Sequence, residues 1–523
     1  MPNAATSAGG RQPTDAILDS NRPETRASAP GTVPRWGMAQ TGNSRIAQLK
    51  SDMALLDDEQ LRAAAGVLDR INSEGLETVR LAFVDQHGVL RGKTIVAAGM
   101  ASAFRNGMAM TSTLLLKDTS HRTVFPVWED NIGFGDGNLT GAGDVLIVPD
   151  PATFRVLPWS PHSGWILCDV RYKDGGAMPF CVRSLLKDTV GKLAADGMAM
   201  VCGLEFEFYV FRMENPHLQH ADSGMPATPP ETSLISHGYQ YLTEARYDAL
   251  EDVMDDLRRG CQQLGLPVRS MEAEFGPSQC EFTFEPASPL EQADNTVLFR
   301  SMVKQVCARK GLHATFMCRP KLEGVIPSGW HMHQSIVDIG TGENLMIPGD
   351  PGALSPTASG WIAGLLEHAA ESCLLTTPTV NGYKRYQPYQ LAPDRIQWGR
   401  DNKGAMVRGL MAPGDKASRI ENRVAEPTAN PYLFMASQIL SGHDGVRRGL
   451  TAPPPVENPY TSDAASLPRS LIAALERFDA SEFYRDALGE NFCAYISRIK
   501  HAEWERYLMT VSEWEQREYF SLF

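Results

Sequence analysis

Four separate segments of the chain alternate polar, mostly charged side chains with large apolar ones at a period of two residues. In the first of them, Glu205 and Glu207 alternate with Leu204, Phe206 and Phe208. A period of two is the repeat of a β-strand, so the two carboxylates are expected on one face of a sheet and the apolar residues on the other. Taken alone, this segment also fits an ordinary sheet with one solvated face.

The same alternation returns three times further along the chain. The polar members are Glu272 and Glu274 followed by Gln279 and Glu281, then His331 and His333, then Arg419, Glu421 and Arg423. Carboxylates that converge raise one another's pKa or repel unless a cation lies among them. Oxygen ligands with one imidazole suit Mg²⁺ or Mn²⁺ better than Zn²⁺. For either histidine alone, a hydrogen-bonded place in the core is an equally good interpretation.

Basic residues concentrate between residues 384 and 423, although 49 Lys and Arg against 62 Asp and Glu give the chain a formal net charge of −13. Guanidinium groups bind carboxylates and phosphates and can offset charge during phosphoryl transfer. Solvated surface charge is the alternative. The stretch Gly88 to Thr94 is one residue short of a phosphate-binding loop and lies between strand patterns, so it predicts a plain hairpin. A divalent metal site together with an arginine cluster, in a chain without a phosphate-binding loop of the Walker type, indicates ATP chemistry on an antiparallel sheet.

The length of 523 residues predicts two unequal domains. Residues 1–42 are rich in Ala, Ser, Thr, Pro and Gly and predict a disordered tail, residues 43–175 a helix with a small β-rich domain, and residues 176–523 the larger domain. Helical periodicity appears over residues 46–72 (with a helix start inside it at Asp57), 183–196, 247–264, 288–311, 359–375, 471–478, 482–488 and 492–520.

Composition also excludes several classes of protein. The acidic balance argues against a nucleic-acid partner, and no apolar run reaches the roughly 18 residues of a membrane span. The first residues show no secretory signal pattern. Nine cysteines occur without a C-x-x-C pair, which is typical of reduced thiols and predicts a cytoplasmic protein without structural zinc.

Taken together, the segments resemble the glutamine synthetase family from about residue 75 to the end. The matching motifs are Gly203-Leu-Glu-Phe-Glu-Phe208, Glu274 through Gln279-Cys-Glu281, Ala314-Thr-Phe-Met317, Ser328-Gly-Trp-His-Met-His-Gln-Ser335, Asn381-Gly-Tyr-Lys-Arg385, Arg419-Ile-Glu-Asn-Arg423, Ala429-Asn-Pro-Tyr432 and Val511-Ser-Glu-Trp-Glu515. The resemblance implies an α+β fold with an N-terminal β-grasp domain and a catalytic domain whose antiparallel strands form a funnel flanked by helices. It also implies a homo-oligomer, typically a dodecamer of two hexameric rings with active sites between subunits.

The resemblance further implies roles for individual residues. Two or three Mg²⁺ or Mn²⁺ ions are expected per active site, one held by Glu207, Glu274 and Glu281 and another by Glu205, His331 and Glu421. Glutamate is expected at Glu274, Gly329, Arg385 and Arg423, and ATP at Ser335, Lys403, Arg408, Lys416 and Arg419. Arg385, Arg408 and Arg423 are the expected catalytic residues. The implied reaction consumes ATP, passes through γ-glutamyl phosphate and ends with attack by a nitrogen nucleophile.

The chain departs from the ammonia-using members of the family where ammonium would bind. Leu391 occupies the position of their proton-accepting glutamate, and the turn Arg105 to Met108 replaces their Asp-Gly-Ser-Ser segment. Tyr239 and Trp330 add aromatic groups that, with Leu391, are expected to line an amine pocket, although Tyr239 also fits a plain packing role. An aliphatic amine with a pKa near 10 must lose a proton before attack, whereas an aromatic amine is already neutral.

A γ-glutamyl ligase of an aromatic amine such as aniline is therefore the favoured interpretation, closest in character to γ-glutamylanilide synthases. An alkylamine ligase is the near alternative, followed by a polyamine ligase, by glutamine synthetase using ammonia, and lastly by a non-catalytic structural or regulatory paralogue. Tyr460 falls near the position where some members are adenylylated, and it is interpreted as an ordinary loop tyrosine.

Overall fold

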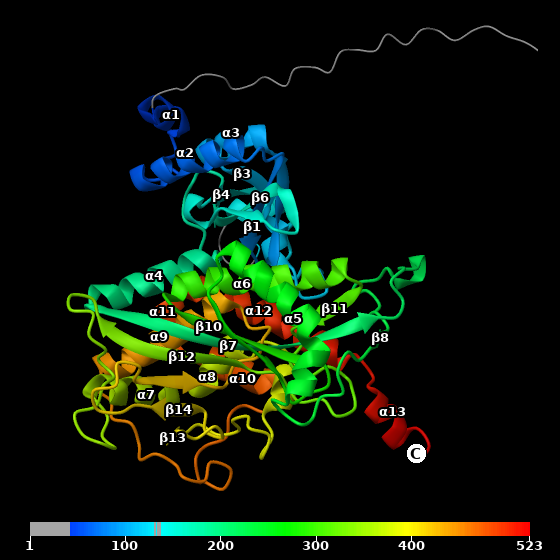
Figure 1. Ribbon diagram of the computed structural model, residues 1–523, viewed down its shortest axis with the longest axis vertical. Helices are drawn as coiled ribbons and strands as arrows, with labels where there is room; N and C mark the ends of the chain where they lie inside the picture. Colours follow the sequence, from blue (N-terminus) through cyan, green and yellow to red (C-terminus); the bar gives the residue numbers. More distant parts are fainter. Residues whose placement is uncertain (1–41, 130–131, 133–136) are drawn as a thin grey trace, which may run out of the picture.

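The computed structural model describes residues 42–129, 132 and 137–523, and shows a small domain above a larger one (Figure 1). Apart from its last residue, the predicted disordered tail lies outside the described residues. The boundaries at 43–175 and 176–523 stay predictions, since the small sheet ends at Arg171 and the first helix of the large domain begins at Val182.

The small domain is built on a mixed sheet with the order β2-β1-β6-β4-β3, and β5 pairs with β6. The central pair, β1 and β6, is parallel and the other pairs are antiparallel, as in the β-grasp domain that the family predicts. Its elements are α1 Gly42–Leu49, α2 Asp58–Ser73, β1 Thr78–Val84, β2 Leu90–Val96, α3 Met100–Asn106, β3 Met108–Thr111, β4 Asp144–Pro149, β5 Arg155–Leu157 and β6 Ser160–Arg171.

The hairpin predicted around Gly88 is confirmed by β1 and β2, which pair from Thr78 opposite Val96 to Val84 opposite Leu90. Gly92 lies inside β2, where an added Cβ would overlap the Leu81 carbonyl. Close backbone contact, and not phosphate binding, therefore accounts for this glycine.

The large domain contains a nine-stranded sheet with the order β13-β14-β15-β12-β7-β10-β9, to which β8 and β11 add by pairing with β7. Only β13 and β14 pair in parallel, and all other pairs in this sheet are antiparallel. The prediction of an antiparallel sheet is therefore confirmed. The strands are β7 Met198–Met213, β8 Thr232–Ser233, β9 Val268–Ala273, β10 Gln279–Ala287, β11 Leu312–Thr315, β12 Trp330–Asp338, β13 Trp398–Arg400, β14 Val407–Leu410 and β15 Arg419–Asn422.

The helices of this domain agree closely with the predicted ranges. They are α4 Val182–Ala195, α5 Glu244–Leu264, α6 Pro289–Arg309, α7 Pro356–Glu367, α8 Ala369–Thr376, α9 Pro431–Arg447, α10 Leu471–Asp479, α11 Glu482–Leu488, α12 Glu490–Leu508 and α13 Glu513–Tyr519. Three predicted ranges are each divided in two: 46–72 at the Asp57 capping box of α2, 359–375 at His368, and 492–520 between α12 and α13. The buried helix α9 was not predicted.

The large sheet is covered by helices on its apolar face. The ring of Phe299 in α6 lies edge-on to Phe206 and Phe208 of β7, with centroids 5.9 and 5.8 Å apart. Phe434 of α9 packs in the same way against Trp330 of β12. The apolar side chains of the alternating strands thus pack in the core. The polar side chains of the same strands lie on the other face of the sheet, where they can form a site.

No helix within the described ranges has the length and apolar character needed to cross a membrane. All nine cysteines are buried as free thiols.

Candidate active site

Strand register brings the polar residues of the four alternating segments together on one face of the large sheet. Residues that face each other across an antiparallel pair point to the same side, with their Cβ atoms about 5 Å apart. The facing pairs are Glu207 with Glu281, Glu205 with His331, His333 with Glu421, and Glu421 with Arg408.

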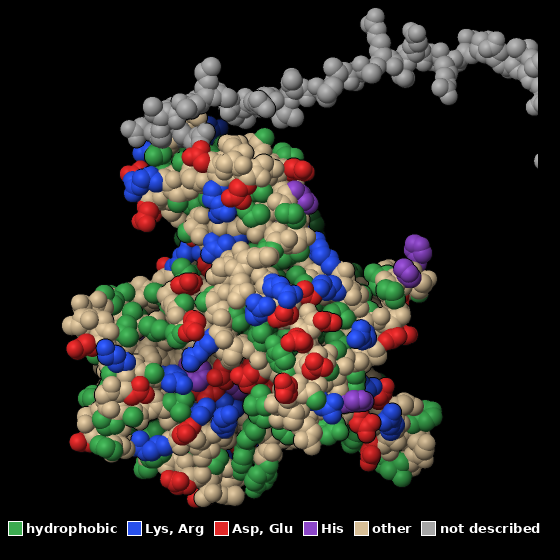
Figure 2. Space-filling view, in the orientation of Figure 1, with side chains coloured by type: hydrophobic (Ala, Val, Ile, Leu, Met, Phe, Trp, Pro, Cys, Tyr) green, Lys and Arg blue, Asp and Glu red, His purple; other side chains and the backbone are tan. Residues whose placement is uncertain are grey.

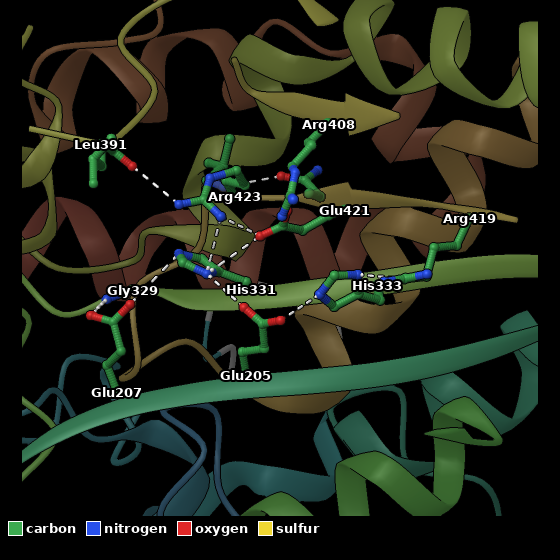
Figure 3. A network of polar contacts seen from close by, with 12 residues as sticks. Glu205, Glu207, Gly329, His331, His333, Leu391, Arg408, Arg419, Glu421 and Arg423 are labelled. Atoms are coloured by element: carbon green, nitrogen blue, oxygen red, sulfur yellow. Dashed lines mark hydrogen bonds and ion pairs between the residues drawn. The ribbon is translucent and has the colours of Figure 1, made fainter. Parts of the chain in front are cut away.

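Two histidines and an arginine surround Glu205 and Glu421 (Figure 3). His333 Nε2 lies 2.8 Å from one Glu205 oxygen, and His331 Nδ1 lies 3.3 Å from the other. His331 Nδ1 is also 3.4 Å from Glu421 Oε1, and Arg423 forms an ion pair with the same carboxylate. Burial alone would raise both carboxyl pKa values, but these partners outweigh it and hold the pKa of Glu205 and of Glu421 below the usual range.

Four further carboxylates, of Glu207, Glu272, Glu274 and Glu281, crowd the neighbouring strands. Burial and the charge of Glu274 raise the pKa of Glu207 to about 8. Burial, followed by the charge of Glu207, raises the pKa of Glu281 well above its usual value, and burial with the Glu274 charge raises that of Glu272. Figure 2 shows acidic side chains gathered in a hollow of the large domain, bordered by Lys, Arg and His side chains. Around these four residues, carboxylate groups therefore outnumber the cationic side chains that could neutralise them.

The donor atoms of this face suit divalent cations. They form three groups, in each of which one ligand atom per residue lies within 4.8 Å of the others. The groups are Glu205, His333 and Glu421; Glu205, Glu281 and His331; and Glu272, Glu274 and Glu281. Carboxylates with at most one imidazole are the ligand set of Mg²⁺ or Mn²⁺. Each group shares two residues with one predicted metal set, but the predicted ligand Glu207 belongs to none of the three. The metal ligands and their division between ions therefore stay predictions.

Two residues in these groups, His333 and Glu272, were not predicted as ligands. Both stand two positions from a predicted ligand, so the period-two pattern contained the signal that would have found them. Burial and the charge of Arg423 lower the pKa of His331 to about 4. The imidazole is therefore neutral at pH 7, the form that binds metals.

Binding of Mn²⁺ or Mg²⁺ is expected to release protons and to strengthen as the pH rises. Glu207, with its pKa near 8, is mostly protonated below that pH, whereas a cation needs the carboxylate. Affinity should therefore increase from about pH 6 to about pH 8, because fewer protons then have to be displaced. Calorimetry in buffers of different ionisation enthalpy measures the released protons, and Glu207→Gln should release fewer. An affinity independent of pH would contradict the expectation.

Arg385 and Arg423 are anchored beside the carboxylates by backbone carbonyl groups. Arg385, at the end of the 3₁₀ helix Gly382–Arg385, donates to the Arg423 carbonyl at 2.8 Å, and its Nη2 lies 3.3 Å from His331 Nε2. Arg423 donates to the Leu391 carbonyl at 3.2 Å. Its Nε is buried and has no hydrogen-bond partner within the described part of the chain. An unpaired buried donor is costly, so this nitrogen is suited to a substrate oxygen.

Gly329 lies at a point where no side chain fits. Its N–H donates to Glu207 Oε2 at 2.9 Å. An added Cβ would lie 2.6 Å from His331 Nε2 and 2.7 Å from Arg385 Nη2. The glycine allows the backbone to approach both side chains, while its expected contact with glutamate stays a prediction, as does that of Glu274.

The predicted nucleotide residues differ in how firmly they are held. Arg408 binds Glu421 at 3.1 Å and Asp401 at 2.6 Å. Lys403 and Lys416 are exposed, and neither ammonium group has a hydrogen bond or ion pair with another described residue.

The remaining two nucleotide candidates adjoin His333. Arg419 Nε donates to His333 Nδ1 at 3.1 Å, and the Ser335 hydroxyl donates to the Ser418 carbonyl at 3.0 Å. ATP contacts by all five residues stay predictions.

The predicted amine pocket needs one correction. Trp330 is fully buried, with its ring 4.8 Å from Phe206 and 5.0 Å from Phe434. It precedes His331 by one residue on a strand and so points to the opposite face, into the core, where it cannot contact an amine. Tyr239 and Leu391 are 58% and 60% exposed. They remain candidates.

Other aromatic residues near the carboxylates were missed from the sequence. The rings of Tyr241 and Phe275 stack 5.8 Å apart and are 40% and 45% exposed. The Phe275 N–H donates to the Glu274 carboxylate at 3.0 Å, and burial together with the charge of Glu274 raises the pKa of Tyr241. Tyr389, also not singled out in the sequence, packs against Tyr460, the residue interpreted there as an ordinary loop tyrosine, with centroids 5.0 Å apart. These contacts join distant loops, and no local pattern signals them.

Comparison with known proteins agrees with this arrangement. Residues 179–519 match the family model described as glutamine synthetase, catalytic domain. A γ-glutamylanilide synthase from Acinetobacter is 42% identical over 487 residues, which cover 90% of this chain and 97% of the relative. A glutamine synthetase from Methanosarcina mazei is 31% identical, with coverage of 87% and 97%. A solved structure described as apo GmaS without ligand superposes with a TM-score of 0.72 at 27% identity, over 87% of this chain and 99% of that one.

The family model covers well over half of the chain, and the relatives align along nearly their whole length. The alternating strands, the carboxylate and histidine face and the adjoining arginines all lie within the matched residues. The chain belongs to the glutamine synthetase family of ATP-dependent carbon–nitrogen ligases.

Proposed function

We propose that this protein joins the γ-carboxylate of L-glutamate to an aromatic amine such as aniline, using ATP and passing through γ-glutamyl phosphate. The observation that carries the choice of amine is the exposed Leu391 side chain, whose own carbonyl is held by Arg423. The position is thus fixed beside the substrate-binding arginine, yet it offers hydrocarbon where ammonia-using relatives are expected to offer a carboxylate. The 42% identical relative, named γ-glutamylanilide synthase, supports the same choice.

The stacked pair Tyr241 and Phe275 adds a second argument for an aromatic substrate. Both rings are partly exposed next to the carboxylate cluster, and aromatic pairs readily accept a further ring at an edge or face. A neutral aromatic amine needs neither a carboxylate to bind as a cation nor a base to remove a proton before attack. An apolar, aromatic rim therefore suits aniline better than ammonium.

The reaction proceeds in two displacements. An oxygen of the γ-carboxylate attacks the γ-phosphorus of ATP, the bond to the β-γ bridging oxygen breaks, and ADP leaves. The amine nitrogen then attacks the acyl carbon, the carbon–oxygen bond to phosphate breaks, and inorganic phosphate leaves. The nitrogen gives up one proton to water or phosphate after attack, because bond formation makes it acidic.

The chain's own residues bind and orient these groups. Arg385 and Arg423 are positioned to hold the carboxylate and then the acyl phosphate, since each keeps one guanidinium edge on backbone carbonyls. Arg408, Lys403, Lys416, Arg419 and Ser335 are proposed to hold ATP. Two or three Mg²⁺ or Mn²⁺ ions on the carboxylate face would neutralise negative charge on the phosphates.

We also propose a cytoplasmic dodecamer of two hexameric rings with active sites between subunits. The turn from Arg105 to Met108 lies in the small domain, far from the carboxylate face of the same chain (Figure 1), so it could act only at a neighbour's site. The C-terminal helix α13 projects from the body with Trp514, Phe520 and Phe523 exposed, as expected of a segment covered by another copy. Mass photometry of the purified chain tests the number of subunits.

A panel of amines tests the function directly. The purified protein is mixed with glutamate, ATP, Mg²⁺ and aniline, isopropylamine, a polyamine or ammonia, and ADP and the γ-glutamyl amide are measured. We expect kcat/KM for aniline to exceed that for ammonia at least about tenfold, a difference of about 1.4 kcal/mol in transition-state binding. Equal use of ammonia would reject the aromatic substrate, and absence of turnover with every amine would reject the ligase.

A further inference from the structure

A cavity of about 550 Å³ lies between the β1–β2 hairpin tip of the small domain and helix α6 of the large domain. Its lining includes His87, Val89, Val297, Arg300, Lys304 and Phe316. Phe316 packs against Phe206, on the apolar face of the sheet. The cavity is therefore separated by the sheet itself from the carboxylate face that forms the candidate active site.

Arg300 brings an uncompensated positive charge to this cavity. Its guanidinium lies 5.6 Å from the Trp330 ring and 5.8 Å from the Phe206 ring, and one nitrogen donates to the Ala429 carbonyl at 2.8 Å. Its Nε is buried with no hydrogen-bond partner, and no carboxylate of a described residue forms an ion pair with it. Burial lowers the pKa of Arg300 to about 10. Burying a guanidinium group without a counter-ion costs desolvation free energy, and a bound anion would offset that cost.

Lys304 adds a second cation one turn further along α6. Burial and the charge of Arg300 lower its pKa, and no described side chain forms a hydrogen bond or ion pair with its ammonium group. Residues four apart on a helix lie on the same side, so the two charges face the cavity together. Like charges at this spacing repel, and an anion between them would relieve the repulsion.

The rest of the lining indicates what kind of anion fits. Val89, Leu90, Val297, Phe316 and Met317 contribute apolar surface, and the volume lies in the range of pockets for small organic ligands. A fully charged, compact anion such as phosphate would leave this apolar surface unpaired. A carboxylate matches the guanidinium edge and brings a hydrocarbon body for the remaining walls.

We propose that this cavity is a binding site for a small organic carboxylate with an apolar body, held by Arg300 and Lys304 and distinct from the glutamate site. The site goes beyond the ligase reaction, because none of the residues assigned to glutamate, ATP or the metal ions lines it. Its occupancy is independent of which amine the enzyme uses.

Calorimetric titration of the full chain with benzoate tests the proposal, in the presence of saturating L-glutamate to fill the active site. Benzyl alcohol, which lacks the charge, and inorganic phosphate, which lacks the apolar body, serve as comparison ligands. Benzoate is expected to bind at least about tenfold more tightly than either. Arg300→Met and Lys304→Met should each weaken benzoate binding by about tenfold or more, with Arg300→Lys less affected. Arg309→Met, on the same helix outside the cavity, is the matched control and should bind as the parent does.

Three results would overturn the site. These are displacement of benzoate by glutamate in the parent protein, binding of benzoate that is unchanged in both Arg300→Met and Lys304→Met, and a Kd for benzoate weaker than about 10 mM. The Lys304 side chain is partly exposed on the surface of α6, so its replacement should leave the fold intact even if the Arg300 variant is unstable. Thermal melting of each variant identifies loss of binding that comes from unfolding.

Discussion

Replacing Glu207 by alanine is expected to abolish turnover with every amine. The Glu207 carboxylate faces Glu281 across β7 and β10, and it accepts hydrogen bonds from the Gly329 N–H at 2.9 Å and the Gln279 amide at 3.1 Å. Its loss removes a proposed metal ligand and releases Gly329, which adjoins Arg385. We expect kcat to fall about a thousandfold or more, since several kcal/mol of charge stabilisation is lost.

The stability of this variant separates a chemical defect from a folding defect. Burial beside other carboxylates raises the pKa of Glu207 to about 8 in the metal-free protein, so the group is mostly protonated at pH 7 and its removal takes away no ion pair that stabilises the fold. The melting temperature without metal should therefore change by no more than about 3 °C. Glu285→Ala, on an exposed position of β10, is the matched control and should retain full activity. A stable Glu207→Ala enzyme with more than about one tenth of the parent activity would contradict the assignment.

The alternating strands were predictable because their polar and apolar halves are both satisfied in the fold. Leu204, Phe206 and Phe208 fill the core, and Glu205 and Glu207 lie in the candidate site. The period-two alternation in the sequence therefore predicted both the buried face and the polar face of the strand. Antiparallel pairing then brought distant segments of the same pattern to one face. Hence the face that carries the carboxylates and histidines was recognisable from the sequence without knowledge of the strand order.

Helix α9 was missed for the opposite reason. It is buried on nearly every side, from Leu433 and Phe434 to Ser441 and Gly442, and therefore lacks the one-sided apolar stripe by which a helix is recognised. Its signal was limited to the Asn430 cap and the proline that follows.

The contacts that position the arginines could not be predicted either, because they join loops far apart in the chain. Glu426 is buried and accepts hydrogen bonds from the Thr379 N–H and hydroxyl, both at 2.8 Å, and so holds the turn that leads to Arg385. Burial raises the pKa of Glu426 to about 7. The prediction for Trp330 was wrong for a different reason. Trp330 was assigned to the amine pocket because it is next to His331 in the sequence, but adjacent residues of a strand point to opposite faces, and Trp330 is buried in the core.

Replacing Leu391 by glutamate is expected to shift the enzyme from aniline to ammonia. The residue has φ of 52°, its carbonyl accepts from Arg423, and its side chain is exposed. A glutamate has the same backbone preference as leucine, so the loop should keep its conformation and present a carboxylate at the amine entrance. Ammonium would then gain a counter-ion and a proton acceptor, whereas aniline would lose apolar contact and meet a charge.

We expect kcat/KM for ammonia to rise, and that for aniline to fall, each by about tenfold or more, which corresponds to roughly 1.4 kcal/mol on each side. Leu391→Gln is the matched control, because it has the shape of glutamate without the charge or the basic oxygen. It should lose aniline turnover in part and gain no use of ammonia, which separates the carboxylate's effect from that of polarity alone. A Leu391→Glu enzyme with the parent's amine profile would show that this loop does not border the amine, and the aromatic specificity would then have to come from Tyr241 and Phe275.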